Sequence, residues 1–203
     1  MTGTPRNVIF DFGGVLIDWN PRHLYRELIG DEEVMEDFLE RVCTQDWNRQ
    51  QDAGRSTAEA TRVLVSAFPK HRDWIEAYYG QFDRMLTGEI AGSVAILRDL
   101  KRRGTPVYGL TNWSADTFPI AEQRFAFLQL LDGVVVSGRE GMMKPDRAIF
   151  DLACARFAIE AGETFFIDDH APNIDAAATL GFHAHHFKDA ETLRRKLAAH
   201  RLL

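Results

Sequence analysis

VIFDFGGVL, residues 8–16, joins a short apolar run to an acid and two glycines. The branched and aromatic residues at its start predict a buried strand. Asp11 follows the strand, and Gly13 and Gly14 allow a tight turn and a close approach of the backbone to a ligand. Asp11 could be a nucleophile, a metal ligand or only the cap of the turn. The stretch alone leaves these alternatives open.

Similar apolar runs recur along the chain, at residues 107–110, 134–136, 164–167 and 182–187. Segments with helical spacing lie between most of them, at residues 90–103, 114–125, 145–157 and 173–180. This alternation predicts βαβ units, and therefore an α/β fold with a doubly wound parallel sheet covered by helices on both faces. Ligands of such a sheet bind beyond the carboxyl ends of its strands.

Residues 21–85 differ from the rest, because they show helical periodicity without a comparable strand run. We predict an inserted α-helical cap subdomain at 19–86, tethered by two short crossings to a core made of 1–18 and 87–203. The spacing of Ser56 and Glu59 is typical of a capping box and predicts a helix that begins near Thr57. A chain of 203 residues has room for one core and one such insert.

Composition excludes several classes of partner. The formal net charge of −6 gives no long-range attraction for polyanions, so we expect no nucleic-acid partner. No segment has the apolar length that spans a bilayer, and residues 1–7 lack the apolar stretch of a secretion signal, so we expect a cytoplasmic protein without a membrane partner. Cys43 and Cys154 lie outside any ligand pattern and predict no disulfide framework or zinc site. The oligomeric state is not predicted.

Polar residues follow the second and third runs. Thr111 and Asn112 come directly after the second run and could hold an anion. Ser114 has the place of a helix cap. Pro145 suits the first turn of a helix and would hold Lys144 just outside it. That lysine could neutralise a phosphate and a carboxylate, or it could simply be solvated.

The fourth run ends in two adjacent acids, Asp168 and Asp169. Like charges so close raise each other's pKa unless a cation compensates them. Oxygen ligands without a thiolate favour Mg²⁺ over zinc. The histidines at 183, 185 and 186 also invite a metal interpretation, but strand alternation divides them between two faces. We expect those histidines to be residues at the edge of the sheet.

Taken together, the motifs at Asp11, Thr111, Lys144 and Asp168 resemble, in order and context, the four motifs of the haloacid dehalogenase-like hydrolase superfamily. The resemblance covers essentially the whole chain. It implies a Rossmannoid core with a helical cap inserted after the first strand. It also implies catalytic roles for Asp11, Lys144 and Thr111, with Asp11 as the nucleophile that forms an aspartyl-phosphate or aspartyl-ester intermediate.

The same resemblance implies a binding site for Mg²⁺ and phosphate. Its metal ligands would be Asp11, the backbone carbonyl of Gly13, Asp169 and, directly or through water, Asp168. Its substrate-binding residues would be Gly13, Gly14, Thr111, Asn112 and Lys144. Thr111 and Asn112 would grip the phosphoryl oxygens, and Lys144 would stabilise charge on the nucleophile and the transferring group.

One position departs from the family pattern. Most phosphatases of the superfamily carry a second Asp two residues after the nucleophile, which protonates the leaving group. This chain has Gly13 there, as in the sugar-phosphate phosphatases with an Asp-Leu-Gly-Asn-Val motif, which also keep the acidic pair. We therefore predict a Mg²⁺-dependent phosphatase of a small phosphate monoester such as a sugar phosphate. A 2-haloacid dehalogenase-type hydrolase and a catalytically impaired phosphate-binding module are the alternatives.

Several residues could surround the substrate. The candidates for the missing acid are Asp18, His23, Asp52 and His170. Residues 51–55 resemble a cap turn that faces the active site in related proteins, which makes Asp52 and Arg55 possible specificity contacts. Trp19 and Trp113 could wall the pocket or belong to the core.

Overall fold

The computed structural model describes residues 3–203. Residues 1 and 2 lie outside the described residues. Two predictions include them, namely the core segment 1–18 and the stretch 1–7 without the apolar character of a secretion signal. A parallel five-stranded sheet in the order β5-β4-β1-β6-β7 forms the core. Its strands are β1 (Asn7–Phe10), β4 (Val107–Thr111), β5 (Gly133–Val136), β6 (Thr164–Asp168) and β7 (His183–His186). All five predicted runs form strands, and the α/β fold is confirmed.

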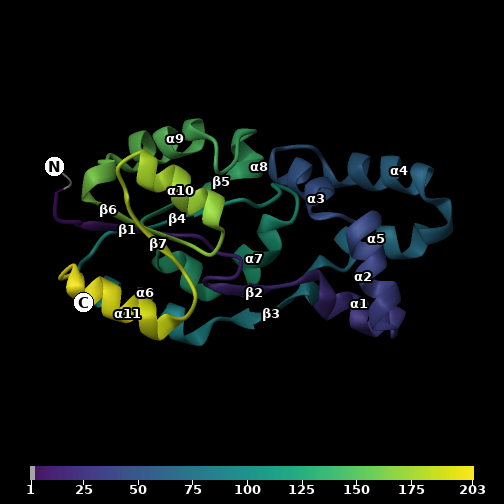
Figure 1. Ribbon diagram of the computed structural model, residues 1–203, viewed down its shortest axis with the longest axis horizontal. Coiled ribbons are helices and arrows are strands. Elements are labelled where there is room, and N and C mark those ends of the chain that lie inside the picture. Colours follow the sequence, from purple (N-terminus) through teal and green to yellow (C-terminus); the bar gives the residue numbers. More distant parts are fainter. Residues whose placement is uncertain (1–2) are drawn as a thin grey trace.

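Helices cover both faces of the sheet (Figure 1). One face packs against α6 (Ala91–Arg102), α7 (Phe118–Arg124) and α11 (Ala190–Ala199), and the other against α9 (Arg147–Phe157) and α10 (Ala171–Thr179). A hydrophobic cluster lies on each face of the sheet. In β1, Val8 and Phe10 belong to the cluster on the first face, whereas Ile9 belongs to the cluster on the second. A strand that is buried on both faces needs apolar residues throughout, which explains the continuous run.

The insert lies between two short strands, β2 (Ile17–Trp19) and β3 (Leu86–Glu89). It contains α1 (Pro21–Ile29), α2 (Glu32–Arg41), α3 (Gln45–Asp52), α4 (Thr57–Ala67), η1 (Pro69–His71), α5 (Arg72–Gly80) and η2 (Phe82–Met85). These helices gather at one end of the molecule, beside the sheet (Figure 1). Its helical character is confirmed, whereas the boundaries 19–86 stay a prediction. The helix start at Thr57 is confirmed, because Ser56 Oγ accepts from the Glu59 amide at 3.3 Å.

The insert is joined to the core by two short crossings near Trp19 and Thr87, as predicted, and these pair as an antiparallel ribbon of β2 and β3, which was not predicted. Two local predictions were wrong. The helix expected from residue 114 begins at Phe118, because Ser114 Oγ accepts from the Asp116 amide and closes a turn instead. The helix expected from Pro145 begins at Arg147, and the Lys144–Pro145 peptide bond that precedes it is cis.

Four further elements were not predicted. They are α8 (Ser137–Glu140), the 3-10 turns η3 (Ala126–Leu130) and η4 (Ala161–Glu163), and the final helix α11. Of the helices in residues 3–203, none combines the length and the apolar character that crossing a bilayer requires.

Candidate active site

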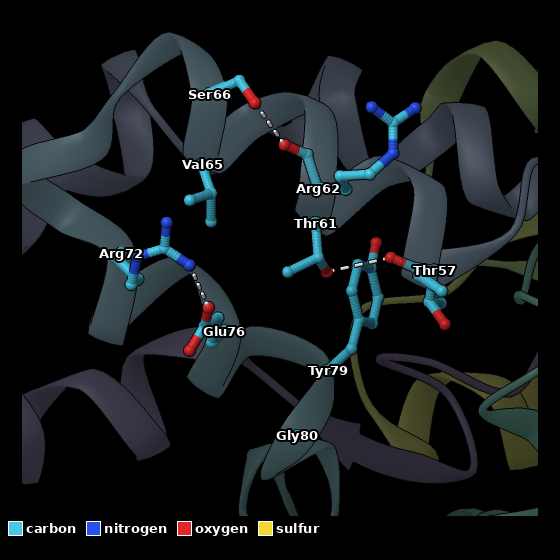
Figure 2. A pocket seen from close by; sticks show the side chains of 10 residues that line it. Thr57, Thr61, Arg62, Val65, Ser66, Arg72, Glu76, Tyr79 and Gly80 are labelled. Carbon is cyan, nitrogen blue, oxygen red and sulfur yellow. Dashed lines mark hydrogen bonds and ion pairs between the residues drawn. The ribbon is translucent and has the colours of Figure 1, made fainter.

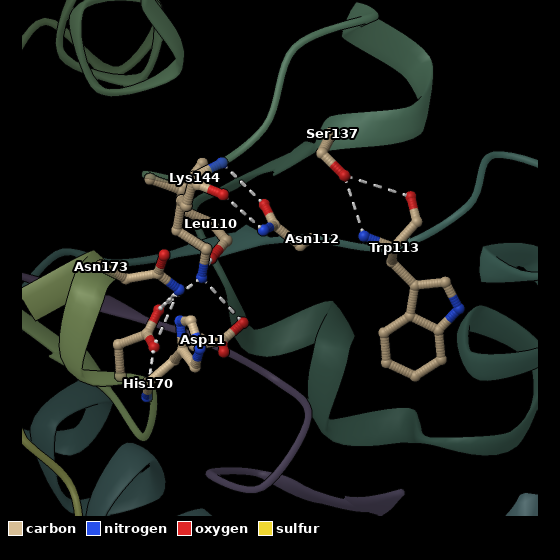
Figure 3. Close-up of polar contacts among 9 residues, drawn as sticks. Asp11, Leu110, Asn112, Trp113, Ser137, Lys144, His170 and Asn173 are labelled. Carbon is tan, nitrogen blue, oxygen red and sulfur yellow. Dashed lines mark hydrogen bonds and ion pairs between the residues drawn. The ribbon is translucent and has the colours of Figure 1, made fainter. Parts of the chain in front are cut away.

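Three predicted site residues meet at the carboxyl ends of the central strands. Asp11 follows β1, Asp168 ends β6, and Lys144 reaches them from the loop before α9. Lys144 Nζ lies 3.0 Å from Asp11 Oδ1 and 2.6 Å from Asp168 Oδ2, and it donates to the carbonyl of Leu110 at 2.7 Å (Figure 3). Because β1 pairs in parallel with both β4 and β6, the ends of these strands come together. The ammonium group of Lys144 thus bridges groups that follow or belong to three neighbouring strands.

The lysine is fully buried. Its side chain has 0% exposure, so the solvated lysine that the sequence also allowed is excluded. Burial alone would lower the pKa of Lys144, but the carboxylates of Asp11 and Asp168 raise it above its usual value. Lys144 therefore stays charged, and it is an integral part of the acidic cluster.

Asp168 is held by donors on every side. Its oxygens accept from Lys144 Nζ, from the His170 amide at 2.8 Å and from Asn173 Nδ2 at 3.1 Å. Asn173, near the start of α10, was missed by the sequence predictions. Its position five residues after Asp168, in the first turn of the following helix, is the signal that could have identified it. The contacts fix the carboxylate rigidly at the end of β6.

The three aspartates form a candidate metal site. Asp11, Asp168 and Asp169 each offer an oxygen, and these atoms lie within 4.8 Å of one another. Within residues 3–203 the histidines of β7 join no such group, and β7 is an edge strand as expected. Burial, followed by the charges of Asp168 and Asp169, raises the pKa of Asp11 to about 7 against the opposing effect of Lys144. An all-oxygen cluster with unbalanced negative charge suits a hard divalent cation such as Mg²⁺.

The residues after β4 differ in what their side chains do. Thr111 is buried, and its Oγ1 has no hydrogen-bond partner. A buried hydroxyl without a partner is costly, which fits a site where an anion binds. Asn112 Nδ2 donates to the Lys144 carbonyl, and Asn112 Oδ1 accepts from the Lys144 amide, both at 2.9 Å. The Asn112 side chain thus holds the Lys144 loop, and its predicted grip on phosphoryl oxygens stays a prediction.

Gly14 is required by its surroundings. Its φ is +71°, and a Cβ there would clash with Asp169 Oδ2. Gly14→Ala is expected to lower the free energy of unfolding by about 1–3 kcal/mol and to displace the Asp169 carboxylate. Gly13→Ala is the matched control, because a Cβ at Gly13 would meet nothing within 4 Å, and its stability should change by less than about 1 kcal/mol. Urea unfolding measures both variants, and equal losses would contradict the expectation.

A cavity of about 690 Å³ lies over the cluster, between the core and the insert. Asp11, Gly13, Asn112, Lys144 and Asp169 line it from the core, and Asn20, Arg22, Glu40, Thr44, Gln45, Asp46, Asn48, Arg49 and Asp52 line it from the insert. A smaller cavity of about 70 Å³ borders Gly13, with Trp19 and Trp113 in its wall. Both tryptophans thus wall the pocket, and Trp113 belongs to the hydrophobic core as well.

The four candidates for a proton donor have different places. Asp52 and His170 line the larger cavity, Asp52 buried and His170 exposed. Asp18 and His23 pair with each other instead, with 3.3 Å between His23 Nε2 and Asp18 Oδ1. Arg55, the other predicted specificity contact, donates from Nε to Gln51 Oε1 at 2.8 Å and is not among the residues lining the two cavities.

A further cavity of about 490 Å³ lies between α4 and α5 of the insert (Figure 2). Several of its polar side chains bond to one another or to their own helix, and Thr57 and Tyr79 bond to residues outside the cavity. Arg72 Nη1 donates to Glu76 Oε1 at 3.0 Å, and Ser66 and Thr61 donate to carbonyls one turn back. These contacts tie the side chains to their own helices. The polar groups that line this cavity therefore form no cluster comparable to the three aspartates.

Comparison with known proteins agrees with this geometry. The protein-family model of the haloacid dehalogenase-like hydrolases matches residues 5–181 of the sequence. The chain belongs to this family. This haloacid dehalogenase-like hydrolase is 28% identical over 190 residues to the sesquiterpene phosphatase astK of Aspergillus oryzae, with 94% of this chain and 93% of the relative covered. Two other curated relatives are longer, and the chain spans 19% and 36% of their lengths.

Solved structures of the family share the fold. The HAD family enzyme bt-2542 of Bacteroides thetaiotaomicron, in complex with magnesium and inorganic phosphate, has a TM-score of 0.67 at 24% identity, with 91% of this chain and 95% of that chain covered. The L-2-haloacid dehalogenase of Xanthobacter autotrophicus, with chloropropionic acid covalently bound, has a TM-score of 0.64 at 15% identity, covering 98% and 84%. Proteins of this fold therefore include one that binds magnesium and inorganic phosphate and one that holds a haloacid covalently.

Proposed function

We propose that this hydrolase is a Mg²⁺-dependent phosphatase of small phosphate monoesters in which Asp11 forms an aspartyl-phosphate. The observation that carries the proposal is the trio of carboxylates within 4.8 Å of one another, bridged in part by a fully buried lysine. A dehalogenase needs a nucleophilic carboxylate but no such acidic cluster. The relatives that are a phosphatase or hold magnesium and phosphate support the same interpretation.

The residues divide the chemistry among them. Asp11, Asp168, Asp169 and the carbonyl of Gly13 would hold Mg²⁺, which when bound neutralises charge on the phosphoryl group. Asp11 attacks phosphorus and becomes the aspartyl-phosphate that water later hydrolyses. Lys144 stabilises negative charge next to Asp11, and the free hydroxyl of Thr111 donates to a phosphoryl oxygen. Asn112 keeps Lys144 in place.

The lining of the large cavity supports a polar alcohol as the leaving group. The insert contributes amides, hydroxyls and charged groups of both signs above the aspartates, namely Asn20, Arg22, Glu40, Thr44, Gln45, Asp46, Asn48 and Arg49. Hydroxyl groups of a sugar can hydrogen-bond to such a surface, which also contains Trp19, Pro21, Leu39, Cys43 and Tyr78. We therefore propose a sugar phosphate or a similar hydroxylated ester as the substrate class.

Phosphate release from a panel of esters tests the function. The panel contains sugar phosphates, an aryl phosphate and a prenyl phosphate, each with Mg²⁺ and with a chelator. We expect release from the sugar phosphates that stops when the chelator is added. Halide release from 2-haloacids without metal would favour the dehalogenase alternative. Binding of inorganic phosphate without turnover of any ester would favour the binding module.

Binding of Mg²⁺ is expected to weaken as the pH falls. Because the pKa of Asp11 is raised to about 7 in the metal-free protein, a proton competes with the cation below that pH. One competing proton makes the affinity about tenfold weaker at about pH 6 than at about pH 8. Calorimetric titration with Mg²⁺ measures the change. Asp11→Asn should remove most of this dependence of the affinity on pH. Equal affinities at both pH values in the unmodified protein would contradict the expectation.

A further inference from the structure

A gap lies beside the nucleophile. Gly13, two residues after Asp11, has no side chain, and a Cβ placed there would meet nothing within 4 Å. The chemistry proposed above still needs a proton at this point, because an alkoxide is a poor leaving group unless it is protonated as its bond to phosphorus breaks. A residue from another element must therefore supply that proton if turnover of alkyl esters is to be efficient.

Asp52, the last residue of α3, borders the same gap. It and Gly13 line the cavity of about 70 Å³, together with Asn112 and Ser114 from the loop after β4. The residue is only 8% exposed, although a carboxylate is costly to bury. His170 also lines the larger cavity but is exposed and is absent from the lining of this smaller one. Asp52 is thus the acid whose position matches the gap.

A hydrogen-bond chain holds the carboxyl group in place. Asn48 Nδ2 donates to Asp52 Oδ2 at 3.3 Å, Tyr79 Oη donates to Asn48 Oδ1 at 2.9 Å, and Gln51 Nε2 donates to Tyr79 Oη at 2.7 Å. The Ser114 backbone, in the loop after β4, faces the Asp52 carboxyl from the core side and opposes the rise of its pKa. This end of α3 is therefore held within the insert and lies against the loop that carries Thr111 and Asn112.

The environment also suits a group that exchanges protons near neutrality. Burial raises the pKa of Asp52 to about 7, against the opposing effects of the Ser114 amide and of Arg49. Tyr78 and Tyr79 of α5 face it. The other titratable groups that share its larger cavity are Arg22, Glu40, Cys43 and Asp46 of the insert and Asp11, Lys144, Asp169 and His170 of the core. An acid with a pKa close to the working pH can give up a proton and recover it within one turnover.

We propose that Asp52 protonates the leaving oxygen and then activates the hydrolytic water, in place of a carboxylate at position 13. The assignment rests on the proposed phosphatase function. As Asp11 bonds to phosphorus, the ester P–O bond breaks, its electron pair stays on the leaving oxygen, and that oxygen takes the proton of Asp52. Water then gives a proton to the Asp52 carboxylate, its oxygen bonds to phosphorus, and the P–O bond to Asp11 breaks. The cycle returns both acids to their starting states.

The test compares Asp52→Asn with the unmodified protein on esters of graded leaving groups, all with Mg²⁺. For an alkyl phosphate such as a sugar phosphate, kcat should fall about 100-fold, because the alkoxide must leave without its proton. For nitrophenyl phosphate, whose leaving group needs no proton, the first turnover should stay fast. A burst of nitrophenol should then be followed by slow release of phosphate and accumulation of phosphorylated protein. Thermal unfolding verifies that the variant is folded.

Two further variants complete the test. Asp73→Asn removes an exposed acid of α5 and should change kcat less than about twofold. Gly13→Asp in the Asp52→Asn background places a carboxyl in the open space and should restore alkyl phosphate turnover by about tenfold. Equal losses of the first-turnover rate on all leaving groups, or a rise of KM without a change of kcat, would overturn the role of Asp52. An unmodified protein that releases no phosphate from any ester would overturn the proposed phosphatase function and this role with it.

Discussion

Asp11→Asn is expected to reduce Mg²⁺-dependent phosphate release at least about 1,000-fold, the largest effect of any single change in this site. The amide cannot attack phosphorus to form the acyl-phosphate, and it carries no charge for a cation. The protein should still fold, because the amide oxygen can accept from Lys144 Nζ, which also keeps Asp168 as a partner. Steady-state release of phosphate and acid-quench trapping of the phosphorylated protein measure the loss.

The control for this variant is another aspartate of the core. Asp175→Asn lies on the exposed side of α10 and should retain activity within about twofold. Trapped phosphate in the unmodified protein but not in Asp11→Asn would support the nucleophilic role. Phosphorylated protein that forms equally in both would show that another residue is the nucleophile, and the assignment of Asp11 would then be wrong.

Much of the core could be predicted because its signals are local. A strand buried on both faces needs a continuous apolar run, such as residues 8–10 of β1 and 165–167 of β6, and such runs stand out in the sequence. The short strands of the ribbon, with the sequences IDW and LTGE, carry no such signal, because they exist only through pairing between distant residues, such as Asp18 with Gly88. The start of α7 was misplaced for a related reason, since Ser114 can cap a turn as well as a helix.

The site could be predicted as a set of residues but not as a set of contacts. The order of the acids at the strand ends predicted which residues come together, because parallel strands bring their carboxyl ends to one edge. The complete burial of Lys144 and its support by Asn112 depend on loops that meet only in the folded chain. Asp52 could be named as a candidate, but its place beside Gly13 follows from how the insert packs on the core.

Lys144→Met is expected to lower the free energy of unfolding by about 3–5 kcal/mol at neutral pH, because it leaves Asp11 and Asp168 buried without their cation. The loss should shrink in acid. Without Lys144 the pKa of Asp11 rises further, and a raised carboxyl pKa gives stability that is present at low pH and lost as the pH increases. Urea unfolding at about pH 5 and about pH 8 measures the difference, and Lys70→Met, at an exposed lysine, is the control with a change below about 0.5 kcal/mol.

Turnover should fall as well, by about 100-fold or more, because charge on the transferring phosphoryl group loses its fixed partner. A second change separates the two effects. Adding Asp168→Asn to Lys144→Met removes one of the stranded carboxylates and should recover part of the stability, since the two side chains are in direct contact. It should not recover phosphate release, because no positive side chain then lies beside Asp11. If stability and turnover returned together, Lys144 would act only by holding the fold, and its direct role in the chemistry would be wrong.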